Sequence, residues 1–314
     1  MATFILRRLI QLAPVLLFLS LIVFVVFRVI PGDAAAVALG EGADQQSLEA
    51  LRHRLGLDQP VYIQYLHWLG SALRGDLGQS FVGHQSVVSL VLEKLPATLE
   101  LSLLSVLLAL LLALPTGILA ATRRGTWVDQ LARLSALAGF CLPRYWLGIL
   151  LILLMAVQAR WLPPAGYVGL TEDPGQSLRY AVLPVLAIGL SLAAVLMRFL
   201  RSSLLEVIGQ DYIRTAHAKG LHGRSVVLGH ALKNSLIPLV TVVGLEFGNL
   251  LGGQVVVEQI FAWPGVGWLM VQSISQRDYA VVQGVVLVIA TGCVIVNLLV
   301  DVVYAYLDPR IRYA

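Results

Sequence analysis

The stretch that decides how this chain is organised runs from Arg201 to Val240 and reads RSSLLEVIGQDYIRTAHAKGLHGRSVVLGHALKNSLIPLV. It is polar and basic, whereas the segments on both sides are apolar and long enough to cross a bilayer. A membrane protein gains little from so long a polar loop unless another molecule binds there. The loop is therefore the first place to look for function.

The pattern inside this loop predicts two short helices around a glycine break. Apolar side chains at every fourth position predict one stripe of a helix: Leu204, Ile208 and Tyr212. Gly220 and Gly223 are expected to break that helix, and Ser225 to cap the next one. Such a helix pair would transmit a push to the spans on either side as rigid bodies.

The composition of the whole chain predicts an all-α membrane protein. Of its 314 residues 58% are hydrophobic and 13% charged, against about 25% charged residues in an ordinary soluble domain. A transmembrane helix needs about 20 mostly apolar residues. Six segments meet this length: Leu9–Ile30, Leu99–Ala121, Leu134–Val157, Tyr180–Leu200, Leu236–Val257 and Ala280–Leu299. The apolar run of the first segment is longer than the core of a signal peptide, so we expect a retained span.

The Lys and Arg residues predict the orientation of the spans. Thirteen of the 22 basic residues fall in the two termini and in loops 122–133 and 198–235. Loop 31–97, on the other side, carries seven acidic residues. Both termini and the polar loop are therefore predicted to be cytoplasmic, and loop 31–97 to lie outside.

Loop 31–97 has the pattern of two short amphipathic helices. Asp44 is expected to cap the first and Gly56 to end it, while Pro60 opens the second and Gly75 ends it. The apolar positions at helical spacing are Leu48, Leu51 and Leu55, then Tyr62, Leu66, Leu69 and Leu73. The two helices, with Trp68 among them, could cap the bundle or form a platform for an external partner.

Two further segments outside the spans carry prolines and glycines. Residues Trp161–Leu178 contain Pro163, Pro164 and Gly166 and are expected to form a short structured lid. The segment Phe261–Gly267, FAWPGVG, is predicted not to be regular helix, because proline and glycine interrupt it.

The fifth span carries a ladder of small residues, Gly244, Gly248 and Gly252, that would let another helix approach closely. This spacing fits packing inside the chain and contact with a second subunit along a transport pathway equally well. Glu246 and Asn249 lie on the same segment, and such polar groups usually face a bundle interior or water. Other polar residues at membrane depth are Glu100, Arg144, Asn297 and Asp301; the three charged ones lie near span ends, where snorkelling to the interface accounts for them.

The chain lacks the motifs of a nucleotide-binding or catalytic protein. No G-x-x-x-x-G-K-[ST] loop, no H-E-x-x-H, no G-x-S-x-G and no Cys/His metal set occurs. We therefore predict a chain that is not an enzyme, binds no metal or cofactor itself, and does not bind nucleic acid.

Several motifs, taken in order along the chain, resemble those of ABC-importer permeases of the dipeptide, oligopeptide and nickel family. The run DYIRTAHAKGL…HALKNSLIPLV resembles their cytoplasmic EAA-type loop. Further similar stretches are RRLIQLAPVLLFLSLIVFVVFRVIPGD, LGLDQPVYIQY, GDLGQSF, LPATLEL, FAWPGVG and NLLVDVVYAYLDPRIRYA. The long outer loop after the first span resembles the first of the two permease types in these systems.

The resemblance implies the partners and the docking residues. A second related permease would complete the pathway, two ATPase subunits using ATP and Mg²⁺ would bind below, and a periplasmic binding protein would deliver the solute. The docking helix would be about Tyr212–Leu221, with Arg214, Thr215, Ala216 and Gly220 in the E-A-A-x-x-x-G frame. The implied docking set also includes Asp211, Tyr212, Lys219 and Leu221. Arg214 stands where the general motif has Glu.

The chain divides into four parts on this basis: residues 1–30 with the first span, the outer loop 31–97, a permease core 98–308 containing coupling loop 201–235, and a cytoplasmic tail 309–314. The resemblance implies a bacterial inner-membrane importer. Di- or oligopeptides are the expected solutes, with nickel chelates or glutathione as alternatives. A stand-alone secondary transporter or channel is the runner-up, although it leaves the polar loop unexplained.

Overall fold

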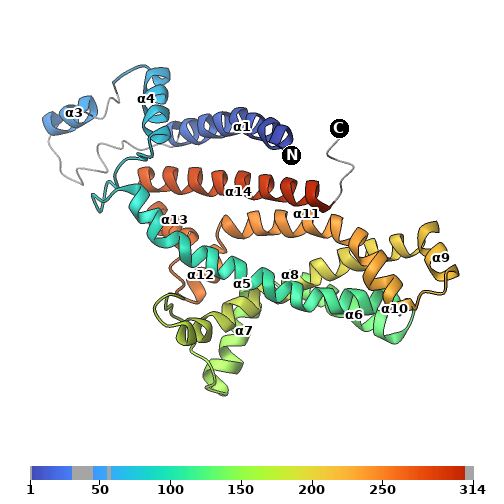
Figure 1. The fold of residues 1–314 in the computed structure, drawn as a ribbon. Helices are drawn as coiled ribbons and strands as arrows, with labels where there is room; N and C mark the ends of the chain where they lie inside the picture. The colour runs from blue at the N-terminus through green and yellow to red at the C-terminus, as the bar shows by residue number, and fades with distance from the viewer. Residues whose placement is uncertain (1, 30–44, 55–57, 308–314) are drawn as a thin grey trace. The chain divides into compact units, whose positions relative to one another are not determined.

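The structure, a computed structural model of the chain, describes residues 2–29, 45–54 and 58–307. Within these ranges every element of more than one residue is helical, as predicted (Figure 1). The long helices are α1 (Ala2–Val29), α5 (Val87–Thr122), α8 (Pro174–Ile208), α11 (Leu232–Leu251) and α14 (Tyr279–Leu307). The shorter ones are α3 (Gln45–Arg54), α4 (Val61–Leu73), α6 (Trp127–Cys141), α7 (Arg144–Leu151), α9 (Asp211–Ala218), α10 (Gly223–Ser225), α12 (Val255–Ile260) and α13 (Val266–Ser275), with π-helical segments η1 (Ile152–Gln158) and η2 (Val226–Ala231).

Five helices in the described part of the chain are long and apolar enough to cross a bilayer, and a bent pair raises the number to six. The bent pair is α6 with α7 and η1, which differ in direction by 97°. The predicted span over Leu134–Val157 therefore has a sharp bend at Pro143, and it is one span if the bent pair is counted together. Leu142, which precedes Pro143, has an extended backbone (φ −78°, ψ 124°), because a proline disfavours the helical conformation of the residue before it.

Two other span boundaries differ from the prediction. α5 begins at Val87 rather than at Leu99. α11 ends at Leu251 rather than at Val257, since Gly253 takes a left-handed conformation (φ +86°) and starts a turn before α12. The last predicted span, Ala280–Leu299, lies wholly inside α14.

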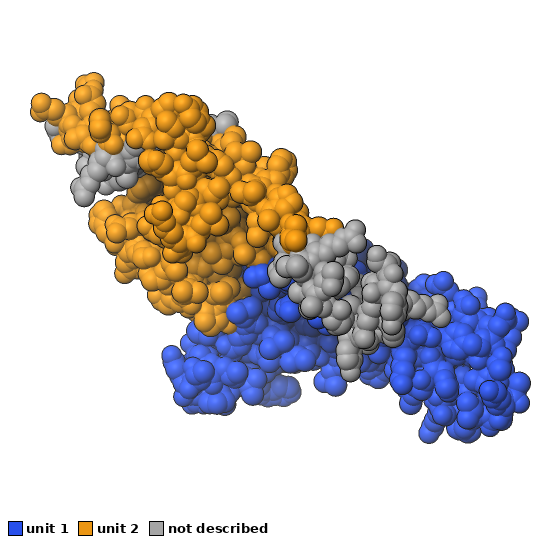
Figure 2. Space-filling model, turned by 45° about the horizontal axis from the view of Figure 1, so that its top comes forward, with its two compact units in different colours: residues 1, 99–263, 295–314 blue, residues 2–98, 264–294 orange. Residues whose placement is uncertain are grey.

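The described residues form two compact units, which Figure 2 colours separately. Of the described residues, unit 1 comprises 99–263 and 295–307, and unit 2 comprises 2–29, 45–54, 58–98 and 264–294. The boundaries between the units fall inside α5 and α14, so each of these two helices has residues in both units.

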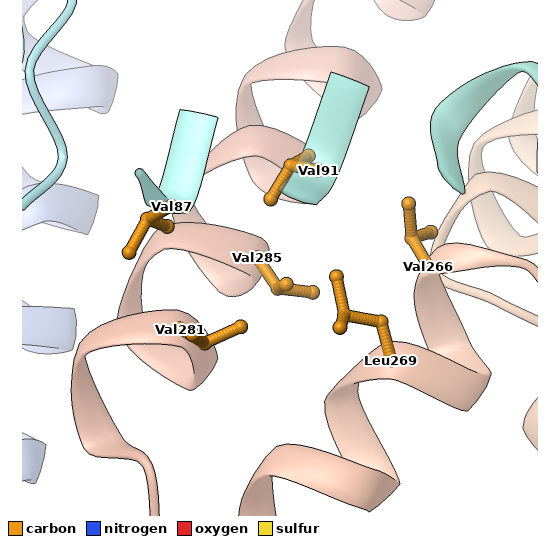
Figure 3. Packing of buried hydrophobic residues seen from close by; sticks show 6 residues of the cluster. All are labelled: Val87, Val91, Val266, Leu269, Val281 and Val285. Carbon is orange, nitrogen blue, oxygen red and sulfur yellow. The ribbon is translucent and has the colours of Figure 1, made fainter. Parts of the chain in front are cut away.

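Unit 2 has a core of valines and a leucine drawn from α5, α13 and α14. Their side chains point toward one another in Figure 3: Val87, Val91, Val266, Leu269, Val281 and Val285. In the same unit the Asp278 carboxylate accepts hydrogen bonds from the Ser80 hydroxyl and, at 3.2 Å, from the Phe81 N–H.

α13 was not predicted from the sequence. Its first turn includes Val266 and Gly267, so only residues 261–265 of FAWPGVG are irregular.

The second helix of the outer loop packs on the first span. α4 crosses the end of α1 (Figure 1), and the Tyr65 hydroxyl lies 2.9 Å from the Ser20 hydroxyl. The Phe24 ring packs against the rings of Tyr65 and Trp68, with centroids 5.4 and 5.7 Å away. The two predicted helices of this loop are thus present as α3 and α4, while the predicted caps Asp44 and Gly56 lie outside the described residues.

α8 is the centre of unit 1. In its most apolar stretch 72% of the residues are buried, against 33% for α5 and 22% for the helix that begins at Gly223. α6, α7 and α11 all pack against it. A helix surrounded in this way is set by packing rather than by lipid.

The polar loop differs in detail from the predicted helix pair. α8 continues to Ile208 and stops at Gly209, so Leu204 and Tyr212 are on different helices. The second predicted short helix is instead the beginning of a longer one, because α10, η2 and α11 follow each other without a break. Gly223 is therefore helical, and Ser225 lies inside the helix rather than at its cap.

Candidate docking helix and polar clusters of unit 1

α9 is attached to unit 1 by two side chains on one face. Ile213 is 2% exposed and Ala216 is 8% exposed, and both belong to a buried apolar cluster. The other buried members come from α5, α8 and η2: Ala121, Leu204, Val226 and Ala231. Because α9 touches the elements on both sides of it in sequence, a displacement of α9 must move their ends as well.

The opposite face of α9 is exposed and polar. Arg214 Nη1 lies 3.3 Å from Asp211 Oδ1, but the two side chains are 76% and 96% exposed, so the pair adds little stability. The Tyr212 hydroxyl accepts from Asn234 Nδ2 at 2.7 Å, which ties the start of α9 to α11. The polar groups of this face thus remain available to another molecule.

Gly220 ends α9 in a left-handed turn. Its φ is +79°, a conformation that glycine adopts without the strain that a side chain brings. Its N–H donates to the His217 carbonyl at 2.9 Å, and the Leu221 N–H donates to that of Ala216 at 3.4 Å. These bonds satisfy carbonyls that the end of a helix leaves free.

Seven of the eight residues of the predicted docking set are exposed around α9. They are Asp211, Tyr212, Arg214, Thr215, Lys219, Gly220 and Leu221. Ala216 is the exception, since it faces the apolar cluster and positions the helix. The helix itself covers Asp211–Ala218 rather than Tyr212–Leu221.

The glycine ladder of the predicted pathway helix has an intramolecular explanation at one position. A Cβ added at Gly244 would overlap with the side chain of Val300 from α14, so this glycine permits close packing inside the chain. Gly248 is also buried, whereas Gly252 is the C-cap of α11 and Asn249 is exposed. Gly252 therefore does not extend the ladder along a continuous helix.

Glu246 is paired with a cation from another helix. Arg144 Nη2 lies 3.5 Å from Glu246 Oε2, and Arg144 Nη1 donates to Gln254 Oε1 at 3.1 Å. The two charged side chains are 27% and 22% exposed. Snorkelling is therefore the wrong explanation for Arg144. Its guanidinium group links α7 to α11 and to the turn that follows α11.

Glu100 was predicted to lie near the end of a span, but α5 begins at Val87 and Glu100 lies inside that helix. It also has hydrogen-bond partners in unit 1. Its carboxylate accepts from the Ser177 hydroxyl at 2.6 Å and from the Tyr167 hydroxyl at 3.2 Å. The Tyr167 ring meets the Trp263 ring edge-on, with centroids 4.7 Å apart. Burial, and then the negative charge of Glu100, raises the pKa of Tyr167 to about 12, so its hydroxyl stays protonated at neutral pH and can donate.

These contacts confirm that residues 161–178 include a structured segment. The Gly166 N–H donates to the Phe261 carbonyl at 2.9 Å, which joins this loop to the turn after α12. The Asp173 carboxylate caps α8 by accepting from the N–H groups of Gly175 and Gln176.

One buried ion pair was not anticipated from the sequence. Asp129 is 1% exposed, and its carboxylate accepts from Arg201 Nε at 2.7 Å and from Arg201 Nη2 at 2.9 Å. This two-point contact fixes α6 to α8. Asp129 lies in the first turn of α6, where acids are common for local reasons, so only its partner reveals its role.

Among the described residues, no group of three or more His, Cys, Asp or Glu side chains is arranged to hold a metal ion. The described part of the chain combines apolar spans with a polar helix, α9, that two buried side chains anchor beside two spans. These features define a multi-pass membrane protein, and its sequence has no nucleotide loop of its own.

The chain matches two families that together cover most of its length. Residues 113–313 match the binding-protein-dependent transport system inner membrane component, and residues 1–102 match the N-terminal region of such membrane components. The chain belongs to this family of transport permeases. It is a non-catalytic, multi-pass membrane component of a bacterial ABC transporter, and it lies in the inner membrane.

Named relatives cover the chain from end to end. The chain is 41% identical over 313 residues to the glutathione transport system permease protein GsiC of Escherichia coli K12, covering 100% of both chains. The protein of the same name from Shigella flexneri serotype 5b gives the same identity and coverage. A chain of the MetNI methionine ABC transporter, solved in inward-facing conformations, has a similar fold with a TM-score of 0.55 and 18% identity, covering 70% of this chain and 96% of that one.

Proposed function

We propose that this chain is a permease subunit of an ATP-driven importer that takes up small peptides of the glutathione class. The relatives that are 41% identical over the full length are named for glutathione transport, which supports this solute, an alternative in the sequence analysis, over the di- or oligopeptides expected first. Nickel finds no support in those names. Membership of a binding-protein-dependent family also favours a component of a larger assembly over a stand-alone transporter or channel.

In this proposal α9 is the helix on which an ATPase subunit docks. The observation that carries it is the division of α9 into a buried apolar face, Ile213 and Ala216, and an exposed polar face. A solvated helix needs no such anchor, whereas a helix that must transmit force needs both an anchor and a free face. The docking set on the exposed face would contact the ATPase, and Arg214 would select an acidic partner.

The proposed mechanism moves α9 and the two helices around it together. ATP binding closes the ATPase pair, which displaces α9, and the displacement passes to α8 and to the helix that begins at Gly223. Ser203 of α8 donates to the Ser235 carbonyl at 3.2 Å, so these two helices are also joined near α9. The chain supplies no covalent chemistry; ATP and Mg²⁺ are used by the two ATPase subunits.

The remaining partners follow from the same proposal. A second, related permease would complete the pathway. α11, with Gly244, Glu246, Gly248 and Asn249, and the Gly252 that caps it would lie near that pathway. A periplasmic binding protein would deliver the solute on the side of loop 31–97. Coupling loop 201–235 and the tail 309–314 would face the cytoplasm.

Gly220→Pro tests the docking assignment. Proline holds φ near −65°, whereas Gly220 requires +79°, so the end of α9 must change. We expect uptake to be abolished while membrane insertion is retained, measured by labelled-solute uptake and by the amount of protein in the membrane. Gly229→Ala is the matched control, since Gly229 is exposed on η2 with open space around it and an ordinary φ. Normal uptake by Gly220→Pro would refute the assignment.

The solute class requires a separate test. Transporter reconstituted with its own binding protein should take up labelled glutathione, and unlabelled glutathione should compete better than an equal concentration of a dipeptide. Preferential competition by the dipeptide would refute the glutathione class without affecting the docking assignment.

A further inference from the structure

A cavity of about 250 Å³ lies in unit 1 where α6 packs against α8. Its lining combines arginines with apolar side chains: Arg133, Ala136, Leu137, Phe140, Ala194, Met197, Arg198 and Arg201. The two helices are joined beside it by the Asp129–Arg201 ion pair. The cavity therefore has a fixed wall on which a ligand could bind.

The charge of this cavity is not balanced by its surroundings. Asp129 is satisfied by the two-point contact with Arg201 and lies 3.7 Å from Arg133 Nε. No acidic residue is among those that line the cavity. Arg201 and Arg133 thus share one buried carboxylate, and Arg198 forms no ion pair with a described residue, which leaves an excess of positive charge that favours an anion.

Arg198 is held in place by aromatic rings. Its guanidinium carbon lies 5.1 Å from the centroid of the Phe140 ring and 6.0 Å from that of Phe199. Such contacts orient the guanidinium group and leave its N–H donors free to bind oxygen. Arg198 is exposed on α8, so a ligand at the surface of the chain can reach those donors.

An exposed apolar stripe of α6 leads into the cavity. Its members recur every three or four residues and are each more than half exposed: Trp127, Leu131, Leu134, Leu137 and Phe140. Leu137 and Phe140 also line the cavity. A small soluble anion would leave this stripe uncovered, whereas an acyl chain would cover it.

We propose that this cavity binds the headgroup of an anionic phospholipid, with its acyl chains along the exposed stripe of α6. The phosphate would accept from Arg198 and Arg133, and Leu134 and Leu137 would contact the chains. Arginines between membrane helices on the cytoplasmic side suit anionic headgroups, and the Lys and Arg distribution predicts that side for this region. A second subunit on this face would instead need an acid opposite Arg198.

The test uses the complete transporter in nanodiscs of equal amounts of phosphatidylglycerol and phosphatidylcholine. Lipids that remain bound after gentle detergent extraction are counted by native mass spectrometry. In Arg133→Gln/Arg198→Gln we expect retained phosphatidylglycerol to fall about fivefold for each arginine removed, since one basic residue near the surface contributes about 1 kcal/mol. Retained phosphatidylcholine should not change.

Two controls make the result specific. Arg224→Gln removes an exposed arginine of α10 that does not line the cavity, and it should leave phosphatidylglycerol retention unchanged. Glycerol 3-phosphate at millimolar concentration should not displace the lipid, because it lacks acyl chains. Equal retention in the double variant, or displacement by glycerol 3-phosphate, would overturn the proposal. So would loss of the second permease from the double variant, because the face would then be a subunit interface.

Discussion

Two segments of unit 1, α9 and the turn Phe261–Trp263, are attached to the same unit in opposite ways. α9 buries only Ile213 and Ala216 and leaves its polar face exposed. The turn buries both of its aromatic rings, since Phe261 is 2% exposed and Trp263 is 0% exposed. α9 therefore contributes little to the core and presents most of its surface to a partner. The turn contributes two large side chains to the core and leaves neither of them exposed.

The backbone of the turn is strained at the residue between its two buried rings. Ala262, between them, has a φ of +48°, a left-handed conformation that is uncommon for residues other than glycine. Gly148 makes room for Phe261, because a Cβ there would lie 3.0 Å from Phe261 Cε2. Burial thus marks the residues that hold the chain together, whereas exposed charge on an anchored helix marks a surface that a partner can contact.

The sharpest test of this comparison is Trp263→Ala. Removing a fully buried indole costs about 3–5 kcal/mol through lost burial and the cavity left behind. We expect a large fall in the thermal unfolding temperature of the detergent-solubilised protein. Trp161→Ala, at a side chain that is 70% exposed, should change it little. An equal effect of the two substitutions would contradict the assignment of the turn to the core.

Ile213→Ala should have the next largest effect, and a different one. The lost burial corresponds to about 2–4 kcal/mol, but it loosens α9 rather than the whole unit. We expect solute uptake to fall several-fold with a smaller change in unfolding temperature than Trp263→Ala causes. Leu228→Ala, on the exposed side of η2, is the control. If uptake stays normal, α9 does not depend on this anchor.

The Arg144–Glu246 pair is intermediate between these two segments, because its side chains are 27% and 22% exposed. Glu246→Gln would leave Arg144 without its carboxylate, at a cost of about 1–3 kcal/mol. The double variant Arg144→Met/Glu246→Leu should recover most of that loss, because it leaves no unpaired charge. Thermal unfolding of Arg144→Met, Glu246→Leu and the double variant gives the coupling free energy between the two side chains. Additive effects would mean that the two side chains do not interact.

Arg214→Ala should have the smallest effect on stability. Its pair with Asp211 is exposed, so we expect no measurable change in unfolding temperature. Under the docking proposal the same variant should bind the ATPase subunits more weakly, as measured by co-purification. Lys233→Ala, an exposed cation of α11, provides the matched control. Unchanged co-purification would remove Arg214 from the docking set.

The features predicted correctly from the sequence are those with a local cause. Apolar length predicted the spans, and the spacing around Pro60 predicted α4. Gly220 ends α9 as expected, because its conformation depends on only a few neighbouring residues. The predicted helix pair failed where local signals were ambiguous: Gly209 ended a helix and Gly223 did not.

The helical membrane class, most of the spans and the polar loop could be predicted from the sequence alone, since hydropathy and turn chemistry act over short stretches of chain. The pairing of Arg144 with Glu246 and of Asp129 with Arg201 is seen only in the folded chain. These partners are 102 and 72 positions apart in the chain. Their pairing depends on which helix faces fold together, and no local pattern encodes that. The two anchors of α9 and the basic cavity beside α8 have the same origin.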